Sequence, residues 1–298
     1  MKEKILRLKK EKNAVILAHY YAPADIQQIA DYVGDSFYLA KVAKTTDADI
    51  IVFCGVNFMG ESAKILNPDK KVLMPDIKAD CPMAHMAGVK KIEELRKKYE
   101  DLAVVCYINS TAELKCSSDV CVTSSNAVKI VKALPNKNIF FIPDKNLGSF
   151  VAKQVIDKNI ILNDGCCPIH ASITAEQLIE EKNLHKNALV LSHPECGAEI
   201  LELSDYIGST AEIINYVNSA EKDEFIICTE DGVEYELKTK NPYKRFYFPN
   251  PHPCCKDMKL NTMENLLRVL EKEDNEIVLS EEESQKALKP LERMLELG

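Results

Sequence analysis

Three uninterrupted apolar runs recur along the chain at intervals of about 86 residues, each preceded by a segment of helical periodicity. They are Ala14-Val-Ile-Leu-Ala18, Leu102-Ala-Val-Val-Cys106 and Ala188-Leu-Val-Leu-Ser192. Two shorter apolar runs follow each of them, separated by further segments of helical periodicity. Short apolar runs that alternate with helices are typical of a parallel sheet covered on both faces. The pattern therefore predicts an α/β protein made of repeated units.

The repeat predicts three small domains rather than the two that 298 residues suggest by length alone. We expect αβα, Rossmann-like domains at residues 1–86, 87–172 and 173–258, related by a pseudo-threefold axis around a shared centre. The further predicted strands are residues 49–53, 71–74, 138–142, 159–162, 224–228 and 244–248.

A C-terminal helical tail, residues 259–298, is expected to pack on the first repeat. In it we predict a helix over Thr262–Glu271, capped by Asn261 or Thr262, a short strand over Glu276–Leu279 and a final helix over Glu281–Leu295.

Composition narrows the class of protein. The net charge of −8 argues against a nucleic-acid partner. No apolar run approaches the roughly 18 residues needed to span a bilayer, and the first residues do not form an apolar signal segment. We therefore expect a cytoplasmic protein with no membrane partner. Eleven cysteines, an odd number, then favour metal or redox chemistry over a disulfide framework.

Polar residues occupy equivalent places after the first strand of each repeat. Ligands of open α/β sheets bind at the carboxyl ends of the strands, so these residues are candidates for a binding site. His19, Tyr107 and His193 stand at the strand ends; Tyr21, Asn109 and Glu195 stand two residues further on; Ser36, Ser124 and Thr210 stand seventeen residues further on.

Each repeat also carries a loop cysteine beside a proline, sixty to sixty-two residues after the strand end: Cys81, Cys167 and Cys255. Spacing barely separates Cys166 from Cys167 or Cys254 from Cys255; Cys167 is preferred because Pro168 follows it, as Pro82 follows Cys81. Three thiolates around one axis suit a [4Fe–4S] cluster with one open iron, which would act as a Lewis acid. Zinc held by three cysteines and a water is the competing interpretation.

The hydroxyl residues and the acid have specific expected roles. Ser36, Ser124 and Thr210 each precede a predicted helix, so they are expected as N-caps, as part of anion sites at helix N-termini, or as both. Glu195 is a candidate general base if burial raises its pKa. His170 is expected to be a packing residue only.

Taken together, these motifs resemble those of the quinolinate synthase family. The resemblance spans about residues 14 to 265 and indicates the short form of that family. The motifs are His19-Tyr-Tyr21, Gly34-Asp-Ser36, Tyr107-Ile-Asn-Ser-Thr111, Thr123-Ser124, Pro143-Asp-Lys-Asn-Leu-Gly148, Cys167-Pro-Ile-His170, His193-Pro-Glu-Cys196, Gly208-Ser-Thr210 and Cys255-Lys-Asp-Met-Lys259.

The resemblance implies three αβα domains around one [4Fe–4S] cluster per chain. It implies condensation of iminoaspartate with dihydroxyacetone phosphate to quinolinate in de novo NAD synthesis, with release of phosphate and two waters. A transient contact with an iminoaspartate-producing enzyme is a further expectation. The family's cysteine-x-x-methionine pattern favours Cys255 over Cys254.

Carried onto matching positions, the resemblance implies three sets of residues. The cluster ligands would be Cys81, Cys167 and Cys255. The substrate site would comprise His19, Ser36, Tyr107, Ile108, Asn109, Ser124, His193, Pro194, Glu195 and Thr210. The catalytic residues would be Tyr21, His193 and Glu195.

Two other functions fit the same thiols. One is a [4Fe–4S]-dependent hydro-lyase acting on a small dicarboxylate. The other is a non-catalytic iron–sulfur sensor, which the absence of a basic face or DNA-binding segment disfavours.

Overall fold

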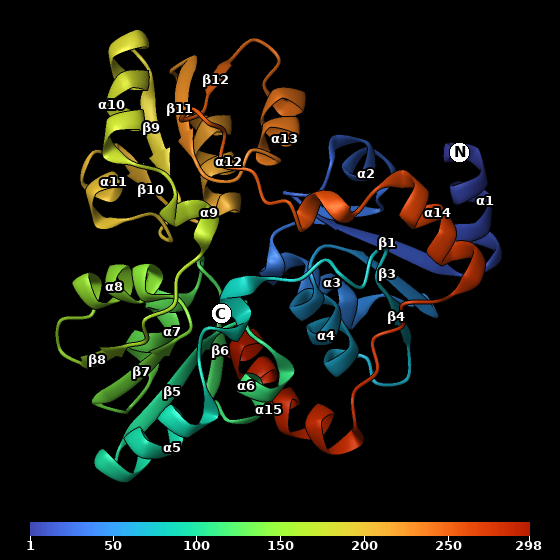
Figure 1. Cartoon of the computed structure of the whole chain (residues 1–298), viewed down its shortest axis with the longest axis horizontal. Helices are drawn as coiled ribbons and strands as arrows, with labels where there is room; N and C mark the ends of the chain where they lie inside the picture. Colours follow the sequence, from blue (N-terminus) through green and yellow to red (C-terminus); the bar gives the residue numbers. More distant parts are fainter.

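The computed structural model describes residues 1–298 and contains three four-stranded parallel sheets, one in each of three lobes around a common centre (Figure 1). All three sheets have the same strand order, which confirms the predicted α/β class and its threefold repetition. In order across each sheet, the strands are β2 (Tyr32–Gly34), β1 (Ala14–His19), β3 (Ile50–Cys54) and β4 (Lys71–Leu73); β6 (Val120–Val122), β5 (Leu102–Tyr107), β7 (Asn138–Ile142) and β8 (Asn159–Leu162); and β10 (Tyr206–Ile207), β9 (Leu189–Ser192), β11 (Glu224–Cys228) and β12 (Arg245–Tyr247).

Helices lie on both faces of each sheet and connect its strands (Figure 1). The first lobe has α1 (Lys2–Glu11), α2 (Ala24–Ile29), α3 (Ser36–Thr45), α4 (Asn57–Leu66) and the 3₁₀ turn η1 (Pro82–His85). The second has α5 (Val89–Lys98), α6 (Ala112–Cys116), α7 (Ala127–Ala133) and α8 (Lys145–Gln154). The third has α10 (Ala175–Leu184), α11 (Ala198–Glu202), α12 (Thr210–Ser219) and α13 (Val233–Lys240). Two short elements lie in the connections: α9 (Pro168–Ala171) leads from the second lobe into the third, and η2 (Met258–Leu260) leads from the third lobe to the tail.

Alternate residues of the first sheet enter two different cores. Val15 and Leu17 of β1 belong to a large core shared by all three lobes, whereas Ile16 and Ala18 face α1, α2 and α14 in a separate core. Successive side chains of a strand point to opposite faces, so both faces of β1 must be apolar. This is why the sequence shows a continuous apolar run.

An aspartate fixes each short edge strand against the centre of its sheet. Asp31, Asp119 and Asp205 precede β2, β6 and β10, and each accepts a backbone N–H bond from the central strand. The bonds are Ile16 N to Asp31 (2.9 Å), Val104 N to Asp119 (2.7 Å) and Val190 N to Asp205 (2.8 Å). Sequence periodicity did not predict β2, β6 and β10, which have only two or three residues.

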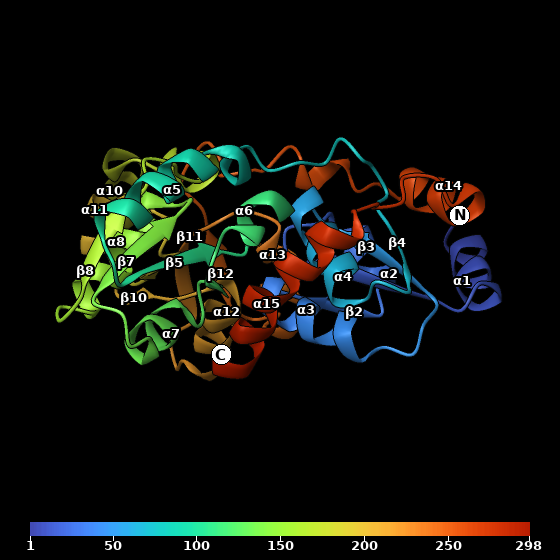
Figure 2. The same ribbon diagram turned by 90° about the horizontal axis from the view of Figure 1, so that it is seen from below.

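The C-terminal tail differs from its prediction in two ways. Residues 276–279 form no strand, because only an isolated bridge joins Glu276 to Leu73. The tail also contacts two lobes: α14 (Met263–Lys272) packs on α1, while α15 (Glu281–Leu297) lies between α4 of the first lobe and α6 and β6 of the second (Figure 2). Thr262 caps α14, as predicted. The boundaries of the three repeats stay a prediction.

No helix combines the length and the apolar character that crossing a lipid bilayer requires.

Candidate active site

One cavity at the centre of the molecule brings together residues from all three lobes. Its lining includes the strand-end residues, the hydroxyl residues and the loop cysteines that the sequence singled out: His19, Tyr21, Ser36, Cys81, Tyr107, Asn109, Ser124, Cys167, His193, Glu195, Thr210 and Cys255. Ile108 and Pro194 are buried but do not line this cavity. Ile108 instead lies along a smaller adjoining pocket, which it shares with Ser36.

The cavity separates the members of the two cysteine pairs. Cys167 and Cys255 line it, whereas Cys166 and Cys254 do not. Cys254 is exposed and Cys166 is half-buried. Geometry therefore distinguishes thiols that sequence spacing could not.

Each cysteine loop is joined to its sheet by the same backbone bond. In each lobe, the third residue after β3, β7 or β11 donates its backbone N–H to the carbonyl of the residue two positions before the cysteine. The pairs are Asn57 to Ala79 (2.8 Å), Lys145 to Gly165 (2.6 Å) and Asp231 to Pro253 (2.9 Å). The three loops are thus anchored to their sheets at equivalent positions.

A carboxylate accepts the backbone N–H of each of these cysteines: Asp80 for Cys81 (2.8 Å), Asp144 for Cys167 (2.9 Å) and Glu230 for Cys255 (2.9 Å). Burial raises the pKa of the Cys81 thiol to about 12 and that of Cys255 to about 11, and raises the pKa of Cys167 well above its usual value. Thiols in such surroundings ionise when a metal compensates their charge. The donor set therefore fits a metal-containing group.

Two sets of three residues each bring their candidate ligand atoms within 4.8 Å of one another. The first set is Cys167, His170 and Glu195, and the second is Glu230, Asp231 and Cys254. In the second, the Lys259 ammonium lies 2.8 Å from Glu230 and 3.0 Å from Asp231, so a cation already neutralises the carboxylates. Cys81, Cys167 and Cys255 do not form such a compact triplet.

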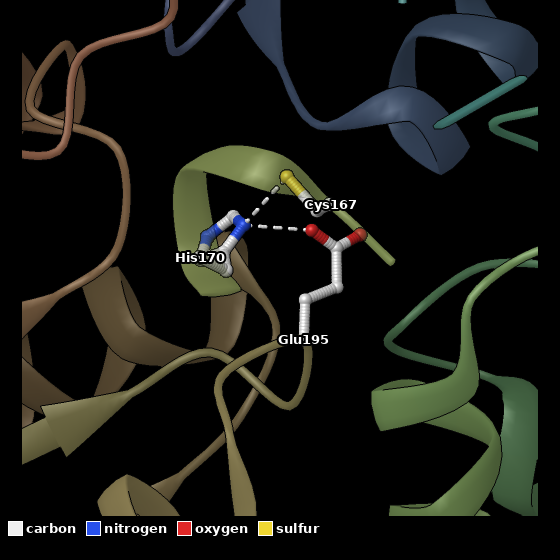
Figure 3. Close-up of side chains that lie close together, drawn as sticks. All are labelled: Cys167, His170 and Glu195. Atoms are coloured by element: carbon white, nitrogen blue, oxygen red, sulfur yellow. Dashed lines mark hydrogen bonds and ion pairs between the residues drawn. The ribbon is translucent and has the colours of Figure 1, made fainter. Parts of the chain in front are cut away.

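His170 links the cysteine side of the cavity to the acid. Its Nδ1 lies 2.7 Å from Glu195 Oε2 and 3.2 Å from Cys167 Sγ, and its Nε2 lies 2.8 Å from the Thr229 hydroxyl. Figure 3 shows both Nδ1 contacts leaving one nitrogen of the ring. His170 is therefore part of the site, which corrects the expectation that it only packs.

The environment of Glu195 lowers its pKa, contrary to the expectation from the sequence. Burial alone would raise the pKa, but the ion pair with His170 and the hydrogen bond that His170 donates outweigh burial and hold the pKa below its usual range. Oε1 of this buried carboxylate has no hydrogen-bond partner. Glu195 is thus an anion with one oxygen free to bind a donor.

His19 and His193 present equivalent donors to the cavity. The Nδ1 of each accepts the backbone N–H two residues further on, from Tyr21 (3.2 Å) and from Glu195 (3.3 Å) respectively. Burial lowers the pKa of both imidazoles to about 3, so each is neutral at neutral pH and carries its proton on Nε2. Nε2 of His193 lies 3.3 Å from the Ser124 hydroxyl.

Tyr21 extends from the first lobe to the third. Its hydroxyl lies 2.6 Å from that of Thr210 and 2.8 Å from that of Thr229. Burial raises the pKa of Tyr21 well above its usual value, and does the same for Tyr107. Both phenols therefore keep their protons and can donate them in hydrogen bonds.

The three hydroxyl residues are not N-caps, contrary to one of their expected roles. Asp35 caps α3, Ser209 caps α12 in a capping box with Glu212, and Asn126 occupies the N-cap position of α7. Ser36 and Thr210 are the first residues of their helices instead. Because neighbouring residues occupy the N-cap positions, the hydroxyls of Ser36, Ser124 and Thr210 do not cap helices and can line the cavity.

Four further residues shape the site: Asp144, His170, Thr229 and Glu230. From the sequence, Asp144 and Glu230 were weak candidates, His170 was expected only to pack, and Thr229 was not singled out. A usable signal existed for His170, since three residues after Cys167 is the same side of one helical turn. Asp144 and Glu230 follow the second predicted strand of their repeats, at equivalent positions. Thr229 had no signal, because its partners come from the first and second lobes.

A family model described as "Quinolinate synthetase A protein" matches residues 3–296. The chain belongs to the quinolinate synthase family. A quinolinate synthase of Fusobacterium nucleatum is 56% identical over 298 residues, covering 100% of this chain and 99% of the relative. Those of Caldicellulosiruptor bescii and Clostridioides difficile are 53% and 51% identical, covering 100% and 99% of this chain and 98% and 97% of the relatives.

Membership of the quinolinate synthase family makes the chain an iron–sulfur-dependent enzyme of NAD biosynthesis that acts on small molecules. The match over nearly the whole chain sets aside the hydro-lyase and the sensor, which were the alternatives left open by the sequence.

Proposed function

We propose that this enzyme condenses iminoaspartate with dihydroxyacetone phosphate to give quinolinate, phosphate and two waters. The observation that carries the proposal is the convergence of one loop cysteine and a set of polar strand-end residues from each of three lobes on a single cavity. The proposal includes a location in the cytoplasm. A transient contact with an iminoaspartate-producing enzyme remains part of the proposal.

The proposed cofactor is one [4Fe–4S] cluster held by Cys81, Cys167 and Cys255. These cysteines line one cavity from three separate loops and do not form a compact triplet of ligand atoms. When bound, such a cluster supplies an iron with an open position, which acts as a Lewis acid toward a departing hydroxyl.

The polar rim of the cavity provides sites for the carboxylates and the phosphate of the substrates. The Nε2–H groups of His19 and His193 and the hydroxyls of Ser36, Ser124 and Thr210 are all donors. Asn109 adds a carboxamide whose Oδ1 is buried without a partner. The first residues of α3 and α12 place helix N-termini at the same cavity, where anions are favoured. Ile108 and Pro194 complete the proposed substrate site. Each lies in the sequence between two residues that line the cavity.

Proton transfer during the condensation is assigned to Glu195, His193 and Tyr21. Glu195 is charged and has a free Oε1, so it can accept a proton from a substrate while His170 donates a hydrogen bond to its Oε2. The Tyr21 hydroxyl can return a proton, since Thr210 and Thr229 hold it at the cavity. His193 orients a substrate oxygen through Nε2–H.

The test uses protein purified without air, with its iron and sulfide content measured first. Incubation with iminoaspartate and dihydroxyacetone phosphate should give quinolinate and phosphate in equal amounts. Reactions that omit either substrate are the controls. A cluster-loaded preparation that forms no quinolinate from both substrates would refute the proposed function.

A further inference from the structure

Gln27 is a buried polar residue outside the cavity that joins the first lobe to the third. Its side chain is 4% exposed, and its Nε2 donates to the carbonyls of Tyr20 (2.8 Å), Ala22 (2.8 Å) and Gly232 (3.0 Å). Gly232 belongs to the loop after β11 in the third lobe. One side chain thus holds the segment on both sides of Tyr21 against the opposing lobe.

The same segment is held from the third lobe by two further residues. Lys259 Nζ donates to the Tyr21 carbonyl at 3.0 Å. A Cβ atom added to Gly232 would stand 2.7 Å from Tyr21 Cα and 2.8 Å from the Tyr21 carbonyl carbon and oxygen. The backbones of Gly232 and Tyr21 are therefore in direct contact, and a side chain at position 232 would force them apart.

The three carbonyls around Tyr21 consequently all have donors, and none of these donors comes from the segment's own backbone. Gln27 satisfies the first and third, and Lys259 satisfies the second. Two of the anchoring residues, Gly232 and Lys259, lie more than two hundred positions away in the sequence. The place of the Tyr21 hydroxyl at Thr210 and Thr229 depends on this junction.

We infer that Gln27 is a positioning residue: it fixes the backbone around Tyr21 against the third lobe, so that the Tyr21 hydroxyl reaches the cavity. The inference rests on the proposed function, in which Tyr21 acts on the substrates. Catalytic groups displaced by about 1 Å can lose about a hundredfold in rate, so the loss of this carboxamide should reduce turnover without touching the cavity itself.

The experiment compares two neighbouring glutamines of α2. Gln27→Met keeps the volume and removes the donors; Gln27→Glu keeps the shape and replaces the donors by acceptors that face three carbonyls. Gln28→Met is the matched control, because Gln28 is exposed on the same helix. Steady-state quinolinate formation, iron and sulfide content and thermal unfolding are measured for each variant in cluster-loaded protein.

We expect both Gln27 variants to lower kcat/KM by about tenfold or more, with unchanged iron and sulfide, while Gln28→Met matches the unmodified protein. A second measurement separates positioning from general destabilisation: in a Tyr21→Phe background, Gln27→Met should add little further loss. Full activity of folded Gln27→Met, or losses from Gln27→Met and Tyr21→Phe that simply multiply, would overturn the inference. Neither result would affect the proposed function, which fails only if the unmodified enzyme makes no quinolinate.

Discussion

The pKa of Glu195 depends more on the neighbouring side chains than on burial. A carboxyl group in an apolar cavity usually has a raised pKa, and the sequence led to that expectation. His170, whose Nδ1 lies 2.7 Å from Glu195 Oε2, reverses it. The group is therefore an anion rather than a neutral acid, and its Oε1 has no hydrogen-bond partner.

Replacing Glu195 tests this arrangement. Glu195→Gln keeps the size and hydrogen-bonding capacity of the side chain but removes the charge and the ability to accept a proton. We expect kcat for quinolinate formation to fall by about a hundredfold or more, with unchanged iron and sulfide content. Glu199→Gln, an exposed glutamate four residues away, is the control and should keep full activity. Normal turnover in Glu195→Gln would remove this residue from the mechanism.

The strand-end residues, hydroxyl residues and loop cysteines that line the cavity could be predicted from the sequence because the repeat marks each kind three times. His19, Tyr107 and His193 occupy the same position in the three repeats, and equivalent positions in a repeat fold to equivalent places. Protonation states could not be predicted in the same way, since they depend on contacts between lobes. His170 comes from the second repeat and Glu195 from the third, and no spacing encodes their 2.7 Å contact.

Among the elements, the shortest strands carry a disproportionate structural role. β2 and β10 lead directly to α3 and α12, whose first residues line the cavity, and β6 leads to Thr123 and Ser124, which line it before α7 begins. An aspartate fixes each of these strands to its central strand. The sequence revealed the long strands through their apolar runs. It also revealed β4 and β12, which have three residues each, but it did not reveal β2, β6 or β10. Nor did it show that the helix caps lie beside Ser36 and Thr210 rather than on them, because propensity locates helix ends only to within a few residues.

The aspartate at the start of β6 provides a test at this scale. Asp119→Ala leaves the Val104 N–H without its partner and breaks the ion pair with Arg96. We expect a loss of about 1–3 kcal/mol in the free energy of unfolding, measured by denaturant titration. Asp119→Asn should lose less, because it keeps an acceptor oxygen. Asp157→Ala, an exposed aspartate in the same lobe, should change the free energy by less than about 0.5 kcal/mol. Equal effects of Asp119→Ala and Asp157→Ala would contradict the role assigned to Asp119.

For the whole molecule, the threefold arrangement was predictable and the tail was not. Three equivalent loops with one cysteine each already indicated a shared centre. The tail has no counterpart in the repeat, so nothing in its spacing showed that α15 would lie between two lobes. Its buried residues Ala287, Leu291 and Met294 show an apolar face, but such a face does not identify its partner.

The paired cysteines allow a matched test of the proposed ligands. Serine replacements of Cys81, Cys167 and Cys255, prepared without air, should each hold much less iron and sulfide than the unmodified protein and should lose quinolinate formation. Cys166→Ser and Cys254→Ser, which change the neighbouring thiols outside the cavity, should keep both. A full cluster in any of the first three variants would show that the thiol concerned is not a required ligand.

The wide separation of the three thiols along the chain determines when the cofactor can be inserted during synthesis of the enzyme. A growing polypeptide has passed through the ribosome almost to its end before Cys255 appears. On the proposed ligand set, cofactor insertion is thus confined to nearly finished chains, and a prematurely truncated product cannot sequester iron in this way.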